Sequence, residues 1–200
     1  MSVIDDPRTK GLIERVRLIL TKPKEAFEVI DGETTTTRDL YLGYACILAA
    51  LPAVALLIVR LMFSGGFFFA PVWALSSAIF SYAMSLLMPF IMALIADALA
   101  PSFGGQKSQS QALKATIYGC TAGWVGGACM IVPIVGGLGA LAGFIYSLYL
   151  LYLALPKLMK VPEDKAAGFV VVVLLATLVV GGVIGSLAVP FHMGRIYYGY

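Results

Sequence analysis

The chain has 200 residues, of which 60% are hydrophobic and only 12% are charged, and its mean hydropathy is +0.92. Soluble domains carry about 25% charged residues, so this composition excludes an ordinary soluble globular protein. The formal net charge is only +3, and no basic block is interleaved with aromatic residues, which argues against a nucleic-acid-binding protein. In a membrane, the same length provides about five spans of about 20 residues each and a short polar head.

Residues 1–38 predict a cytoplasmic amphipathic head with two short helices. Apolar residues recur at helical spacing between Leu12 and Leu20, and charged residues lie between them. The second helix begins near Pro23, a typical first-turn residue. Two roles remain open, because the head can lie on anionic head groups or simply cover the cytoplasmic end of the bundle. The residues expected at the membrane surface are Arg15, Arg17, Lys22 and Lys24.

Five apolar segments of membrane-spanning length follow the head. They cover about residues 40–63, 71–100, 111–132, 138–159 and 166–190. Pro52 and Pro89 lie inside the first two segments, where a membrane helix tolerates them as kinks. The predicted fold class is an all-α integral membrane protein, a five-helix transmembrane bundle over residues 39–191 with a short amphipathic cytoplasmic N-terminal head. Residues 192–200 are expected to form an aromatic tail at the outer face.

Small residues recur four positions apart in three of the predicted spans, which favours close helix packing. The glycines concerned are Gly119, Gly123 and Gly127, then Gly139 and Gly143, then Gly181 and Gly185. The pattern fits packing within one chain or between copies, so the oligomeric state stays open.

The basic residues predict the orientation of the bundle. Twelve of the 14 lysines and arginines fall in the head or in the loops after the second and fourth spans. Since cytoplasmic loops carry the excess of lysine and arginine, the amino terminus is expected in the cytoplasm and the carboxyl terminus outside.

Catalytic chemistry has little support in the sequence. The one histidine, His192, follows the last predicted span, so a nucleophile inside the bundle lacks a histidine base. Cys46, Cys120 and Cys129 lie in apolar segments without metal-site spacing. We therefore predict no enzymatic activity, no cofactor and no metal.

The best candidate for a functional polar site comprises Asp97, Lys107, Lys114 and Tyr118. Ionisable residues near membrane depth tend to pair, and the turn after the second span brings Asp97 and Lys114 toward each other. A structural tie between these two residues is one interpretation. The other is a small polar site where an ion, a head group or a partner binds.

The ordered motifs of the chain resemble a known family. They are Pro101-Ser102-Phe103-Gly104-Gly105, Gln111-Ala112-Leu113-Lys114 leading into Tyr118 and Trp124, Leu151-Tyr152-Leu153, Pro156-Lys157-Leu158-Met159 and Val161-Pro162, with Lys22-Pro23 before the first span. Together they resemble the bacterial Yip domain family, relatives of the Ypt-interacting proteins.

This resemblance implies a cytoplasmic head followed by five membrane helices in a bacterial inner membrane, with no catalytic residues. Eukaryotic relatives bind Rab-type GTPases and shape organelles. We expect a membrane scaffold or adaptor that organises protein partners, copies of itself or local lipid structure through helix packing and its cytoplasmic loops. The alternative is a small transporter, channel or lipid-moving protein with a polar opening near Asp97, Lys114 and Tyr118.

Overall fold

The fold is described from a computed structural model, which covers residues 7–63, 70–132 and 135–197. Within these ranges the side chains of residues 7–10, 63, 70–71, 73 and 187–197 are not described. Residues 64–69, between the first two predicted spans, residues 133–134, between the third and fourth, and the last three residues of the aromatic tail therefore lie outside the described residues.

All regular structure in the described residues is helical. In chain order the elements are α1 (Pro7–Thr21), α2 (Pro23–Gly32), α3 (Thr37–Leu40), η2 (Tyr41–Ala45), α4 (Cys46–Phe63), α5 (Ala70–Leu99), η3 (Ala100–Phe103), α6 (Gln109–Gly119), α7 (Thr121–Ala128), η4 (Cys129–Ile131), α8 (Val135–Leu158) and α9 (Glu163–Tyr197).

Four helical segments of the described chain are long and apolar enough to cross a membrane. They are Thr37–Met62, Ala74–Phe103, Val135–Leu158 and Glu163–Ser186, which agree with the first, second, fourth and fifth predicted spans. The third predicted span is interrupted at Cys120, where α6 ends and α7 begins. The last helix continues beyond the predicted end at residue 190 and reaches Tyr197.

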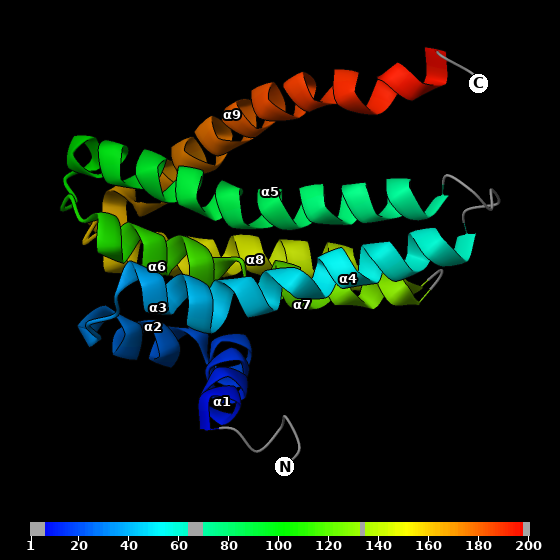
Figure 1. The fold of residues 1–200 in the computed structure, drawn as a ribbon. Helices are drawn as coiled ribbons and strands as arrows, with labels where there is room; N and C mark the ends of the chain where they lie inside the picture. Colours follow the sequence, from blue (N-terminus) through cyan, green and yellow to red (C-terminus); the bar gives the residue numbers. More distant parts are fainter. Residues whose placement is uncertain (1–6, 64–69, 133–134, 198–200) are drawn as a thin grey trace.

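The long helices lie roughly side by side, and the head, α1 and α2, lies against one side of them, toward one end (Figure 1). The helices α4, α5, α7 and α8 form the body of the bundle, whereas α9 diverges from α5 toward its carboxyl end (Figure 1). Helix α6 is the most enclosed part, because all of its residues 112–119 are buried. The core therefore lies near the end of the bundle that carries the head, while apolar side chains further along are exposed as expected for contact with lipid.

The close approach of α7 and α8 explains most of the glycine pattern. A Cβ atom on Gly143 would lie 2.5 Å from the carbonyl oxygen of Ala122 and 2.8 Å from the Cα atom of Gly126. Gly119 faces Leu151 of α8, Gly123 faces Ser147, and Gly139 faces Cys129. Gly126, which the four-residue spacing missed, is thus at the centre of this contact.

Three of the predicted packing glycines do not take part in the α7–α8 contact. Because the helix is interrupted at Cys120, Gly127 turns toward Pro52 of α4, whose Cβ atom would be 2.8 Å from an added Cβ. A Cβ atom added to Gly181 would lie 2.8 Å from the methyl group of Met88. A Cβ atom on Gly185 would meet no described atom within 4 Å.

The substitution Gly143→Ala tests the α7–α8 contact. We expect it to lower the free energy of unfolding by about 1–3 kcal/mol, because the new methyl group must displace backbone atoms. Gly182→Ala is the matched control, since a Cβ atom there meets nothing within 4 Å and alanine is the better helix former. Thermal unfolding in detergent compares the two, and equal stability of both variants contradicts the predicted clash.

Candidate functional site

Lys114 fastens the head to the bundle. Its side chain comes from the enclosed helix α6 and is only 2% exposed. Its ammonium group donates hydrogen bonds to the carbonyl oxygens of Ile30, at 3.0 Å, and Glu33, at 2.8 Å. These carbonyls belong to the end of α2, where backbone oxygens lack partners within the helix and the helix dipole is negative. Lys114 therefore caps α2 and satisfies its own buried charge.

Asp97 does not form the tie with Lys114 that the sequence favoured. The residue is 9% exposed, and its Oδ1 atom has no hydrogen-bond partner. The reason lies in the head, whose α2 carbonyls take the ammonium group of Lys114. Lys107 is exposed on the loop before α6. Of the four predicted site residues, the structure brings only Lys114 and Tyr118 into one network.

Arg15 enters this network from α1. Its Nη2 atom lies 2.7 Å from Oε1 of Glu33, and its guanidinium carbon lies 5.8 Å from the centre of the Tyr118 ring. Burial lowers the pKa of Arg15, but the hydrogen bond to Glu33 and the electrostatic interactions with Tyr118, Glu33 and Tyr44 together outweigh burial, so the pKa of Arg15 is raised. The sequence had placed Arg15 on the outer face of the head. The four-residue spacing between Arg15 and Ile19 was the missed signal. Residues four apart share a helix face, and Ile19 is fully buried, so Arg15 faces the bundle as well.

Tyr118 continues the network into the bundle. Its ring meets that of Tyr44 edge to face, with 4.8 Å between the ring centres. The hydroxyl groups of Tyr44 and Thr121 are 2.8 Å apart, and Thr121 in turn donates to the carbonyl oxygen of Tyr118 at 2.7 Å. These contacts join α6, α7 and the start of the first span at the point where the third helix is interrupted.

A second set of contacts holds the outer side of the head. Gln111 donates to the carbonyl oxygen of Asp31 at 3.1 Å, and Lys160 forms an ion pair with the Asp31 carboxylate. From α8, Tyr146 donates to the carbonyl oxygen of Leu20 at 2.8 Å. We call the residues Arg15, Asp31, Glu33, Gln111, Lys114, Tyr118 and Lys160 the head junction.

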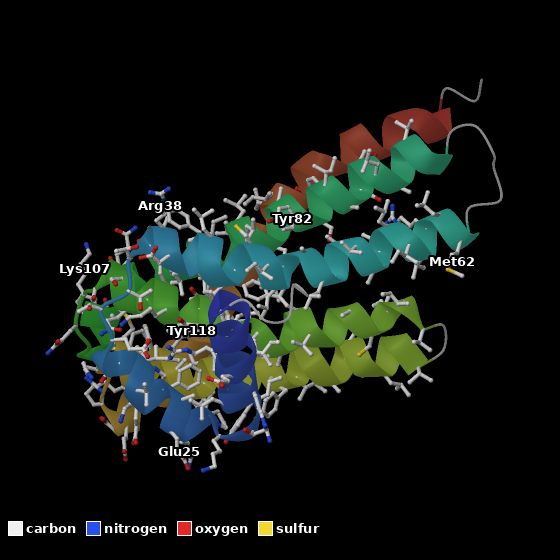
Figure 2. The ribbon with its side chains drawn as sticks, turned by 60° about the horizontal axis from the view of Figure 1, so that its bottom comes forward. Glu25, Arg38, Met62, Tyr82, Lys107 and Tyr118 are labelled. Atoms are coloured by element: carbon white, nitrogen blue, oxygen red, sulfur yellow. The ribbon has the colours of Figure 1, made fainter. Side chains whose placement is uncertain are left out.

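The remaining predicted surface residues lie at the same end of the molecule but outside the head junction. Arg17, Lys22, Lys24 and Lys107 are exposed, and Lys22 forms a 3.0 Å ion pair with Glu25. Figure 2 shows Lys107, Arg38 and Glu25 at the end that carries the head, with Met62 at the opposite end. The described residues contain no group of three histidine, cysteine, aspartate or glutamate side chains suited to a metal ion. The groups that this end of the molecule presents to a ligand or partner are charged and hydrogen-bonding side chains.

Replacing Lys114 with methionine tests the head junction. We expect Lys114→Met to remove the ammonium donor of the Glu33 carbonyl and to leave the Ile30 carbonyl with only the 3.3 Å bond from the Glu33 amide, which costs about 1–3 kcal/mol. Amide hydrogen exchange in α2 should become about ten-fold faster or more, while the long helices stay protected. The control is Lys107→Met, which removes the same charge from an exposed loop. Unchanged exchange in α2 would show that Lys114 does not hold the head.

Comparison with known proteins identifies the family of the chain. A family model described as the Yip1 domain matches residues 17–185. Searches of curated proteins and of solved structures give no match. The family match begins within α1 and ends within α9, so it takes in α2, the capping Lys114 and every element of the bundle up to the last helix. The protein belongs to the Yip1 domain family, a family of membrane proteins that is not known for enzymes.

Proposed function

We propose that the protein is a non-enzymatic membrane scaffold or adaptor, which presents its head and cytoplasmic loops to a protein partner, to another copy or to the lipid surface. The observation that carries this proposal is that the polar residues at the head end make contacts within the fold. Lys114 and Tyr118, which would line the opening of a transport path, instead bind the head. The head and bundle thereby form one packed unit with a charged surface.

The proposal includes five crossings of a bacterial inner membrane. Residues 109–131 would be about 34 Å long at 1.5 Å per residue, and α7 packs closely on α8. A hydrocarbon core is about 30 Å thick, so α6, α7 and η4 together have the length of a broken third span. With five spans, the exposed basic residues around the head support an orientation with the amino terminus in the cytoplasm and the carboxyl terminus outside.

The exposed charges at the head end supply the partner surface in this proposal. Arg17, Lys24, Arg38 and Lys107 are exposed there, whereas Arg15 and Lys114 hold the fold together. Charged surface residues steer and orient a partner more than they set its affinity. Changing them should therefore affect binding without affecting folding.

The charge-reversed variant Arg17→Glu/Lys107→Glu tests the adaptor function. We expect native mass spectrometry of the protein, extracted gently from its own membrane, to show a stoichiometric partner with the natural chain. The variant should lose most of that partner and keep the thermal stability of the natural chain. Arg17→Lys/Lys107→Arg is the charge-preserving control. A partner retained by the reversed variant, or the absence of any protein partner with the natural chain, contradicts the adaptor proposal.

A transport function is the second candidate, and one observation favours it. The Oδ1 atom of Asp97 is buried without a hydrogen-bond partner, and unpaired acidic groups at membrane depth commonly mark ion or substrate paths. In this candidate an ion, a small solute or a lipid passes near Asp97, and Lys114 and Tyr118 border the opening from the side of the head.

The substitution Asp97→Asn separates the two candidates. Since no ion pair with Lys114 is lost, we expect the free energy of unfolding to change by no more than about 0.5 kcal/mol or to rise. A scaffold should then show no flux in liposomes with either chain. Flux that the natural chain supports and the folded Asp97→Asn variant loses would establish transport, whereas a large loss of stability would show that Asp97 has a structural role.

A further inference from the structure

Helix α1 runs across the long helices rather than along them, and both views agree on this (Figure 1, Figure 2). Its contacts fix its level along the bundle. Arg15 of α1 lies over the ring of Tyr118, which meets the ring of Tyr44 near the start of the first span. The carbonyl oxygen of Leu20, near the other end of α1, accepts a hydrogen bond from Tyr146 of α8. The helix therefore lies flat against the side of the bundle and crosses the proposed spans.

The level of α1 matches the edge of a hydrocarbon core. Tyr44 lies about 29 Å from Phe63, the last residue of α4, at ~1.5 Å per residue, and a hydrocarbon core is about 30 Å thick. On α8, Tyr149 and Tyr152 follow Tyr146 within two turns and are 43% and 48% exposed. Exposed tyrosines are enriched at membrane interfaces. Both spans therefore place α1 in the interfacial layer on the side of the head.

Helix α2 lies farther toward the end of the bundle. Its acidic residues Glu28 and Asp31 form ion pairs with Lys157 and Lys160, which lie at and just beyond the end of α8. Lys157 is about 17 Å beyond Tyr146 along that helix, at ~1.5 Å per residue. A lipid surface at the level of α1 would thus leave α2 in water. The two helices of the head have different surroundings.

The exposed face of α1 has the composition of an interfacial helix. Ile13 is 52% exposed, and Arg17, four residues later on the same face, is exposed as well. The sequence of α1 contains four basic residues and one acidic residue, Glu14. Helices that lie in a membrane interface place apolar side chains at the edge of the acyl chains, and their basic side chains attract anionic lipids.

We propose that α1 lies in the plane of the membrane, half-immersed in the leaflet on the head side, with Ile13 among the acyl chains and Arg17 at the phosphates of anionic phospholipids. The lipid-facing surface of the first span is continuous with α1, because η2 contacts α1 and its Leu42 is 59% exposed. This inference rests on the proposed function and deepens it by naming the lipid surface as the partner of α1. The side of the membrane on which the head lies does not affect it.

Spin labels measure the depth of α1. A nitroxide is attached to Ile13→Cys in the full chain, with the three native cysteines replaced by alanine, in liposomes of phosphatidylethanolamine and phosphatidylglycerol. Val29→Cys is the matched control, since Val29 is 53% exposed on α2, and Leu178→Cys, 71% exposed on α9, marks the hydrocarbon core. We expect oxygen, but not a nickel chelate in the water, to relax the label at Ile13, about 5–10 Å below the phosphates. The chelate should reach the label at Val29.

Each outcome of the depth measurement decides a separate point. Equal depth of the labels at Ile13 and Val29, whether in water or in lipid, overturns the proposal. A label at Leu178 that lies in water shows that the chain does not enter the membrane, which overturns the proposed spans together with this inference. The purified chain in liposomes needs no protein partner, so a failure of the adaptor function alone leaves these readouts unchanged.

Arg17→Gln tests the attraction of anionic lipids. We expect the natural chain to bind dimyristoyl phosphatidylglycerol more tightly than dimyristoyl phosphatidylcholine in native mass spectrometry. The variant should lower this preference about five-fold, the contribution of one basic residue near a membrane surface. The control is Lys107→Gln, which removes the same charge from the exposed loop before α6 and should keep the preference. Equal binding of the two lipids by the natural chain, or a preference unchanged in Arg17→Gln, overturns the placement of Arg17 at lipid phosphates.

Discussion

The bond between Lys114 and the end of α2 is the constraint on which the head end of the molecule depends. A buried ammonium group is costly unless hydrogen bonds satisfy it, and the last carbonyls of a helix need donors. The two groups satisfy each other, because the ammonium group of Lys114 donates hydrogen bonds to the carbonyl oxygens of Ile30 and Glu33. This contact fixes Glu33, and Glu33 in turn positions Arg15 over Tyr118.

The interruption at Cys120 has a structural reason that follows from the two neighbours of the third helix. Before the break, α6 must meet the head, and after it α7 must approach α8 closely at Gly126 and Gly143. Groups near the break find partners: Thr121 donates to the carbonyl oxygen of Tyr118, and the amide of Gly123 donates to Ser147 at 2.7 Å. A broken membrane helix is tolerated when side chains satisfy its backbone in this way.

Hydropathy and spacing predicted the long apolar helices well, because lipid demands continuous apolar helices of a certain length. They also placed Gly143 on a helix-packing face and Lys114 in a polar site near membrane depth. They did not predict the partner of Lys114. Asp97 was the only nearby acid in the adjoining spans, and the actual acceptors are backbone carbonyls of the head, which no side-chain pattern reveals. The break at Cys120 was missed although Gly119 directly precedes it, because the glycines of this segment were interpreted as a helix-packing face.

The residues that carry the family resemblance act mainly within the fold of this chain. Gly104 has a φ angle of +79°, which glycine adopts without strain, and a Cβ atom on Gly105 would lie 2.8 Å from the carbonyl oxygen of Met159. Lys114 and Tyr118 hold the head, as described above. Residues engaged in this way are not available to a partner. Under the proposed function, specificity for a partner resides in exposed side chains outside the motifs, such as Lys107 on the loop before α6.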